Sequence, residues 1–341
     1  MKNNLKSVAE WKKLVEEFQK PHRGRALWQC ANTLGPILGI WIALYFLYPV
    51  SVWASILLAA LAGLFLVRAF IIFHDCGHGS FFKSKKANDA LGFFTGMLTF
   101  TPYHHWKWEH AVHHATNGDL DKRGIGDVWT MTVEEYLTSS RRVKISYRLL
   151  RNPLILFGLA PLFLFFVLER FPSSKCKPRE RRSVYLMNFT LLLWGVAMSL
   201  IFGFLPWLIL QTVMMGVAGG CGIWLFYVQH QFEDTYWAQG KEWDFTAAAM
   251  EGSSYYKLPK IMQWFSGNIG FHHIHHLNPM VPNYNLEKCH HSDPFFQVAP
   301  ELNLWTSIKT IKFRLWDEAN GKMISFRELK NQLAAQELKA A

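Results

Sequence analysis

The sequence contains little of what proteins use to form disulfides or to hold iron–sulfur clusters. Its five cysteines are odd in number, and no two of them form a Cys-x-x-Cys pair. Disulfide frameworks, iron–sulfur sites and zinc fingers usually require such pairing, so none of these is indicated and we expect free thiols. The five positions are Cys30, Cys76, Cys176, Cys221 and Cys289.

Other signatures are missing as well. No repeat with a period of about 20 to 50 residues is visible, which argues against a solenoid or propeller. There is no Gly-rich dinucleotide fingerprint and no His-Pro-Gly-Gly motif of a fused cytochrome-like domain. We also expect no cleavable signal peptide, because the first 25 residues are polar; the first apolar run then serves as the membrane address.

What the sequence does contain is apolar residues. Half of the chain is hydrophobic, with 27 Phe and 15 Trp, yet its mean hydropathy of +0.05 requires large polar parts. An ordinary soluble domain is less apolar than this. The composition therefore predicts a polytopic membrane protein with a large aqueous part.

Four apolar runs are each long enough to cross roughly 30 Å of hydrocarbon. They pair into two hairpins whose tips contain no Lys or Arg, whereas residues 1–27 carry seven and residues 141–151 and 170–182 are densely basic. The positive-inside rule then places the tips outside and both termini in the cytoplasm. The predicted spans are residues 28–48, 51–73, 184–203 and 207–228.

Two shorter apolar runs, residues 91–102 and 154–168, are predicted to be half-inserted or interfacial segments. Basic residues flank the second run on both sides, and Gly158 and Pro161 lie inside it. The net charge of +11 is then largely membrane-surface charge, and nucleic acid is not expected as a partner. Residues 277–341 form a cytoplasmic tail, with a solvated helix predicted after Gly321.

Three histidine clusters carry the chemistry, and each lies just outside an apolar segment. Spacings of three and four residues place side chains on one face of a helix, so each cluster is predicted to aim two or three imidazoles at a common point. Imidazole suits iron, copper, zinc and nickel, and so many histidines exceed what one ion can bind, so two metals are predicted. The clusters are His74-Asp-Cys-Gly-His78, His110-Ala-Val-His113-His114 and His272-His-Ile-His275-His276.

A further ligand candidate, His230, directly follows the fourth span, at the same depth as the first cluster after the second span; a structural role is the alternative. Nearby carboxylates could accept the second imidazole N–H and so fix the tautomer. The candidates for this role are Asp75, Glu109, Glu233 and Asp234. His104, His105 and His273 fall outside the ligand faces, and His22, His290 and His291 are expected to be structural.

The three histidine boxes, with the Asp119 to Tyr136 run and the Tyr227-Val-Gln-His230-Gln-Phe-Glu-Asp segment, resemble the membrane fatty acid desaturases, specifically their bacterial acyl-lipid branch. The resemblance covers about residues 68 to 290. It implies one all-α membrane domain with four spans, a cytoplasmic helical cap and a non-haem di-iron centre that uses O2. It implies as iron ligands His74, His78, His110, His113, His114, His230, His272, His275 and His276.

The resemblance also implies the partners: acyl chains of membrane lipids as substrate, and an external electron donor such as ferredoxin or flavodoxin. It implies a bacterial inner membrane with the active site in the cytoplasm. The chain departs from one pattern, because animal acyl-CoA desaturases place a water-holding Asn one turn before the fourth-span histidine. Here that position is Phe226, and Asn268 or Gln229 could replace the missing amide.

Other functions fit parts of the same pattern. A hydroxylase or a carotenoid oxygenase of the di-iron superfamily would show nearly the same boxes. A histidine-rich metal transporter would place its ligands near the bilayer midplane, whereas these lie at span ends. A haem electron carrier would need only one or two axial histidines. The double-bond position, the lipid headgroup and the oligomeric state are not encoded in any motif.

Overall fold

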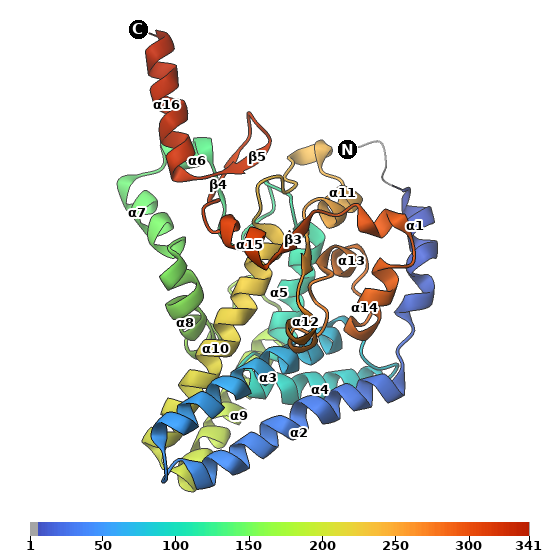
Figure 1. The fold of residues 1–341 in the computed structure, drawn as a ribbon, viewed down its shortest axis with the longest axis vertical. Coiled ribbons are helices and arrows are strands. Elements are labelled where there is room, and N and C mark those ends of the chain that lie inside the picture. The colour runs from blue at the N-terminus through green and yellow to red at the C-terminus, as the bar shows by residue number, and fades with distance from the viewer. Residues whose placement is uncertain (1–5, 341) are drawn as a thin grey trace.

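The computed structural model describes residues 6–340, which are mostly helical (Figure 1). Four helices are long and apolar enough to cross a membrane, as predicted: α2 (Arg23–Leu47), α3 (Val52–His78), α9 (Pro178–Phe202) and α10 (Phe204–His230). They extend beyond the predicted apolar runs at their polar ends. In particular α3 continues to His78, where Gly79 adopts the left-handed conformation and ends the helix.

Consecutive long helices pack against each other, and the two pairs meet. Ser51 caps α3 directly after the turn that follows α2. Both connecting turns lie together at the lower left of Figure 1, where the Trp41 and Phe202 rings are 5.3 Å apart. The pairs are joined through α3 and α10, because a Cβ on Gly63 would lie only 2.7 Å from Val217 Cβ. Glycine is therefore required at this crossing.

The two shorter apolar runs form separate features. The first begins in α4 (Lys85–Leu98), which packs along α3, and continues four residues beyond it. The second forms the π-helical η3 (Ile155–Leu159), α8 (Ala160–Phe166) and the 3-10 turn η4 (Leu168–Arg170). This segment is bent by 63° from the preceding α7 (Arg141–Leu150). Counted as one span, the bent pair would raise the number of candidate spans to five.

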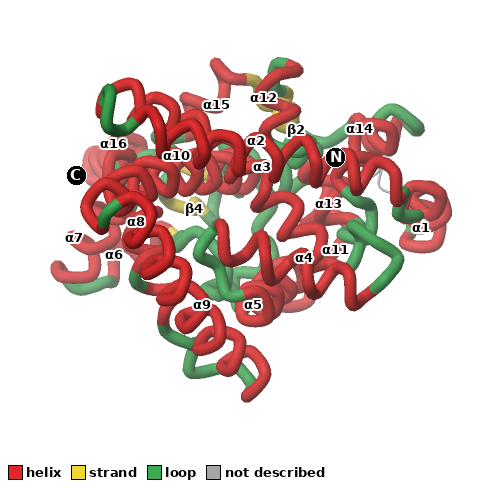
Figure 2. Tube along the Cα trace, turned by 90° about the horizontal axis from the view of Figure 1, so that it is seen from below, coloured by secondary structure: helices red, strands yellow, loops and turns green. Residues whose placement is uncertain are grey.

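The remaining elements lie above the long helices in Figure 1, and Figure 2 shows them from below. Among them, α5 (Tyr103–Thr116) packs against α9. The other helices are α1 (Val8–Val15), α6 (Val133–Thr138), α11 (Phe245–Met250), α12 (Lys260–Phe265), α13 (His272–Leu277), α14 (Asn283–His290), α15 (Leu304–Thr310) and α16 (Phe326–Ala340). Short 3-10 turns are η2 (Glu16–Gln19), η5 (Gly240–Glu242) and η6 (Pro294–Gln297).

The sequence analysis predicted helices only, but residues 6–340 also contain five short strands. One small sheet has the order β1-β4-β5 and the other pairs β2 with β3 in parallel. The predicted break at Gly321 is the turn between β4 and β5, with φ of +60°, and α16 follows it. The strands are β1 (Met131–Thr132), β2 (Tyr255–Lys257), β3 (Glu301–Asn303), β4 (Leu315–Asp317) and β5 (Lys322–Ile324).

A buried apolar cluster supports the part that carries α13. Trp11 and Val15 of α1 pack there with Met250, Phe271 and Leu286. The Trp11 indole N–H donates to the Thr246 hydroxyl at 3.2 Å. The N-terminal helix α1 therefore packs against the part of the protein formed by α11, α13 and α14. Of these, α13 carries the last histidine cluster. All five cysteines are free thiols, as predicted.

Candidate metal centre

The structure brings the nine predicted histidines together from four helices, α3, α5, α10 and α13. Those of α3 and α10 lie at the C-terminal ends of these helices. Their ring nitrogens form two groups, and within each group the nitrogens lie within 4.8 Å of one another. We call the first group A and the second group B. Group A is His74, His78, His110, His114 and His275, and group B is His113, His230, His272 and His276.

One sequence expectation was wrong in detail, because neither triplet aims at a single point. In α5, His110 and His114 join group A while His113 joins group B. In α13 the division is reversed, with His275 in group A and the pair four residues apart in group B. Residues four apart are about 40° apart around a helix, but adjacent residues are about 100° apart, so a triplet must diverge. Each of these two helices therefore serves both groups.

The nitrogen atoms of each group converge in a way that suits a cation. Nε2 of His110 lies 3.0 Å from Nε2 of His74 and 3.1 Å from Nε2 of His114. In group B, Nε2 of His272 lies 2.9 Å from that of His230. A neutral imidazole has one N–H, so these close contacts leave several lone pairs directed at one another.

Further ring nitrogens in the two groups are buried and have no hydrogen-bond partner. They include Nε2 of His78, His113 and His275. Buried polar atoms without partners are rare in folded proteins, and a bound metal ion is one of the accepted explanations. The donor sets, five nitrogens and four nitrogens, fit transition-metal ions well.

Burial lowers the pKa of several of these histidines. Desolvation, reinforced by neighbouring imidazoles, holds the pKa of His110 and His114 well below the usual value. The same causes lower the pKa of His272, His275 and His276. Only the neutral ring offers a lone pair to a metal, so the site is prepared for binding at neutral pH.

Backbone and carboxylate oxygens hold the second ring nitrogen of several histidines. Nδ1 of His74 lies 3.1 Å from an oxygen of Asp75. The other Asp75 oxygen accepts two 2.7 Å hydrogen bonds from the backbone and side-chain nitrogens of Asn283. Nδ1 of His230 lies 3.1 Å from the carbonyl oxygen of Gly252. These contacts fix ring orientation and leave Nε2 directed into the group.

Asp127 was missed as a partner by the sequence analysis. Its Oδ1 lies 2.6 Å from Nδ1 of His113, and its Oδ2 accepts from the Gly124 backbone N–H at 3.2 Å. The carboxylate reaches α5 from a loop in which Gly124 and Gly126 have positive φ. A Cβ on Gly126 would lie 3.2 Å from the Glu109 carbonyl oxygen, so the loop passes close to α5. The only available signal was the Asp119 to Tyr136 run noted in the family resemblance.

The other predicted partners have contacts elsewhere. Glu109 lies 3.4 Å from Nδ1 of His105, and burial raises the pKa of its carboxyl to about 7. Glu233 faces Lys322 at 3.7 Å. Asp234 lines an open cleft of about 840 Å³ beside β3 and α15. Asn268, which has φ of +60°, donates to the Asn283 carbonyl oxygen and so reaches group A only indirectly.

An aromatic ring packs against each group, Trp106 against group A and Phe226 against group B. Trp106 stacks on His110 with ring centroids 4.4 Å apart, and a Cβ on Gly77 would approach this indole to 3.1 Å. Phe226 lies 5.1 Å from both His113 and His230. Phe226 thus lines group B with an apolar ring, and the Gln229 amide donates to the Ile269 carbonyl oxygen.

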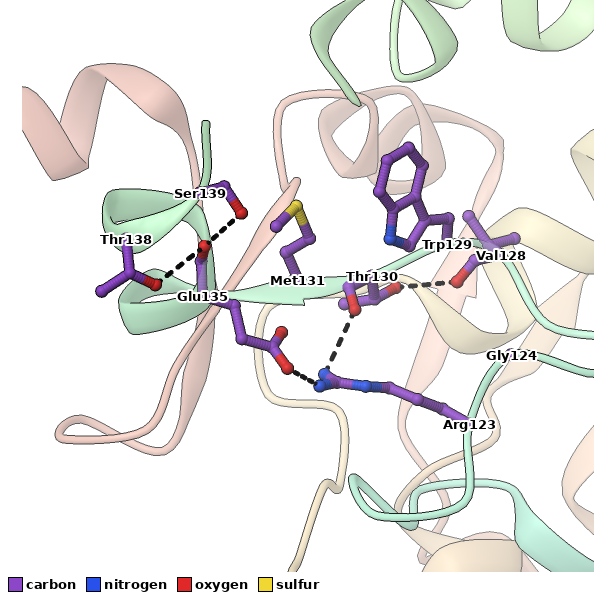
Figure 3. Close-up of a pocket in the computed structure, with 9 residues that line it drawn as sticks. All are labelled: Arg123, Gly124, Val128, Trp129, Thr130, Met131, Glu135, Thr138 and Ser139. Atoms are coloured by element: carbon purple, nitrogen blue, oxygen red, sulfur yellow. Dashed lines mark hydrogen bonds and ion pairs between the residues drawn. The ribbon is translucent and has the colours of Figure 1, made fainter. Parts of the chain in front are cut away.

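The pocket drawn in Figure 3 lies on the loop that carries Asp127 but contains none of the nine histidines. It has a volume of about 450 Å³. Arg123 reaches across it to Glu135 and to the Thr130 carbonyl oxygen. Thr138 and Ser139 close the far side and bond the backbone of Glu135. Its charged groups, Arg123 and Glu135, are already paired with each other, whereas the nine histidines form the candidate metal centre.

Comparison with known proteins agrees with this site. A sequence model of the family described as fatty acid desaturase matches residues 51–300, which is more than half of the chain. The matched region contains all nine histidines. The chain therefore belongs to the fatty acid desaturase family and is an enzyme of that family, as the histidine boxes predicted.

Individual relatives carry more specific names. The chain is 47% identical over 320 residues to a fatty acid desaturase of Bacillus subtilis (strain 168), covering 94% of this chain and 91% of the relative. It is 27% identical over 296 residues to the sn-1 oleoyl-lipid 12-desaturase of Synechocystis sp. (strain ATCC 27184 / PCC 6803 / Kazusa), covering 82% and 79%. It is 27% identical over 235 residues to the chloroplastic sn-2 acyl-lipid omega-3 desaturase (ferredoxin) of Helianthus annuus, covering 64% and 50%.

Proposed function

We propose that the protein inserts a double bond into acyl chains of membrane lipids at a non-haem di-iron centre, using O2 and electrons from an external carrier. The balanced reaction converts a CH2–CH2 unit, O2, two electrons and two protons into CH=CH and two waters. The single observation that carries the proposal is the division of nine histidines into two adjacent groups.

The residues of groups A and B are the proposed iron ligands. Removing hydrogen from an unactivated methylene needs an oxidant that no side chain supplies, and iron with O2 supplies it when bound. The chain's own part is to hold the imidazoles of His74, His113 and His230 in place through Asp75, Asp127 and the Gly252 carbonyl oxygen. Trp106 and Phe226 exclude water from the sides of the two groups that they cover.

We propose that one domain spans residues 1–341, with four membrane-crossing helices in two hairpins and the histidines on the cytoplasmic side. The contacts of the 154–170 segment support four crossings and not five. Before the segment, Arg151 bonds Gln231, directly after α10. After it, the Ser173 backbone N–H donates to His105 and the Ser183 hydroxyl accepts from the His104 backbone N–H, both on α5. Both ends of the segment therefore lie on the side of the histidines.

The substrate and the donor are supported by the relatives. The Synechocystis protein is named as an oleoyl-lipid desaturase and the Helianthus annuus protein as an acyl-lipid desaturase, and the second name includes ferredoxin. The absence of a dinucleotide fingerprint or Cys-x-x-Cys pair from the sequence agrees with electrons arriving from a separate protein. We further propose a bacterial inner membrane as its location, and the similarity to the Bacillus subtilis relative supports this.

Expression in a host that lacks comparable unsaturation, with a matching electron donor, tests the proposal. Gas chromatography with mass spectrometry of the host lipids should show new double bonds, and the purified protein should carry two irons per chain. His230→Ala should abolish the product as completely as His113→Ala, because each removes one of four proposed ligands of group B. His22→Ala should keep activity. Hydroxylated or carotenoid products, or a single zinc per chain, would overturn the assignment.

A further inference from the structure

Helix α7 has a surface that suits neither water nor a protein core. Four of its ten residues are cations, Arg141, Arg142, Lys144 and Arg148, and none is acidic. Between the cations lie apolar side chains that are half exposed: Ile145 (49%), Leu149 (53%) and Leu150 (46%). Tyr147 is the one residue of this helix that is fully buried. Intermixed cations and exposed apolar residues are typical of helices that lie in a membrane interface.

The depth of α7 is fixed by its neighbours. Its C-terminal cap, Arg151, donates to the Gln231 side-chain oxygen at 2.8 Å. Gln231 directly follows α10, so the end of α7 lies level with the point where α10 ends.

The next segment descends from that level along α10. A Cβ added to Gly220 would lie 2.8 Å from the Phe157 carbonyl oxygen, and one added to Gly219 would lie 2.7 Å from Pro161 Cβ. The segment therefore packs directly against these two glycines of α10. Gly220 lies ten residues, or roughly 15 Å, before the end of α10. Because α7 is bent by 63° from this descending segment, it runs away from the axis of the span and across its end.

From these observations we propose that α7 lies in the lipid headgroup layer and binds anionic phospholipid headgroups. The inference rests on the membrane orientation proposed above. Arginine and lysine bind phosphate oxygens through charge-assisted hydrogen bonds, while Ile145 and Leu149 enter the boundary between headgroups and acyl chains. Each basic residue near an anionic surface strengthens the attraction about fivefold.

Hydrogen bonds of Arg151 connect the C-terminal end of α7 to segments that contact group B. This buried guanidinium bonds Gln231, the Phe313 carbonyl oxygen and the Trp129 carbonyl oxygen. Gln231 follows His230, and Trp129 belongs to the loop that holds Asp127 against His113. Arg151 therefore connects the end of α7 to two segments that contact the same histidine group.

Photo-crosslinking locates α7 without any need for activity. The protein carrying p-benzoylphenylalanine at position 145 or 149 is reconstituted into vesicles of phosphatidylcholine with phosphatidylglycerol and irradiated. Mass spectrometry should find phospholipid adducts at both positions, as at the span position 200, where Leu200 is 83% exposed. Position 241, on the exposed Lys241 of η5, should give none. Crosslinks from position 145 to protein, or the absence of lipid adducts, would overturn the placement.

Spin-labelled lipids test the headgroup preference. The association of labelled phosphatidylglycerol relative to phosphatidylcholine is measured by electron spin resonance for wild type and for the triple variant Arg141→Gln, Arg142→Gln, Lys144→Gln. The preference should fall at least twofold in this variant. A matched variant that removes three exposed cations from the cap, Lys12→Gln, Lys13→Gln, Lys241→Gln, should keep it. An equal loss in both variants, or no loss in the first, would refute the proposal even in a fully active desaturase.

Discussion

Replacing Asp127 tests whether the loop at residues 118–130 supports group B as the geometry indicates. Its Oδ1 lies 2.6 Å from Nδ1 of His113, and its side chain is only 10% exposed, so water cannot easily take its place. A carboxylate behind a metal-binding histidine typically contributes 10 to 100-fold in affinity or activity, or about 1.4 to 2.7 kcal/mol. Asp127→Asn keeps an acceptor oxygen but loses the charge, so it should cost about tenfold. Asp127→Ala removes both and should approach 100-fold.

The assay is metal content per chain after graded chelator treatment, followed by double-bond formation in host lipids. Because His74 of group A has its own carboxylate, Asp75, the alanine variant should lose one of two metals first. Glu233→Gln is the matched control, since that carboxylate is 45% exposed and faces only Lys322. Two metals held as tightly in Asp127→Ala as in wild type would refute the reasoning.

Three further predictions concern pH, packing and topology. Burial lowers the pKa of His273 to about 3, so the folded state binds fewer protons than the unfolded state below pH 6.5. In metal-depleted protein this residue alone should therefore lower the free energy of unfolding by roughly 2 kcal/mol at pH 5 relative to neutral pH. The thermal midpoint should fall accordingly, and an unchanged midpoint would contradict this. Gly63→Leu, which crowds α10, should lower the free energy of unfolding by about 1–3 kcal/mol. Gly39→Leu should leave it unchanged, because nothing lies within 4 Å of a Cβ built at that position. Cysteine labelling should reach position 175 from the cytoplasm and position 205 from outside; labelling both from one side would overturn the proposed orientation.

Features set by periodicity were predictable from the sequence, and features set by loops were not. Apolar length predicted the four long helices, and the four-residue spacing correctly placed His74 and His78 on one helix face. Asp127 carries no such signal, because it lies in a loop whose path depends on two glycines and on contact with α5. Glu109 looked equally suitable by position, but its side chain turns toward His105.

The division of the histidines into two groups was also beyond the sequence. Spacing shows which side chains share a face of one helix, but not where another helix places its own ligands. His113 joins group B because α10 and α13 present His230 and His276 to that side of α5. The two short sheets escaped prediction for a similar reason: strands of two or three residues are too short to show alternation and form only through distant partners.

The sharing of α5 and α13 between the two groups bears on how the protein is made. Each group takes residues from α13, near position 275, as well as from helices synthesised some 150 or more residues earlier. Group A cannot be complete before His275 has been synthesised, nor group B before His276, and α13 must then pack near α5. A nascent or truncated chain therefore offers only part of each donor set, and full metal loading becomes a late event in biogenesis that reports a finished fold.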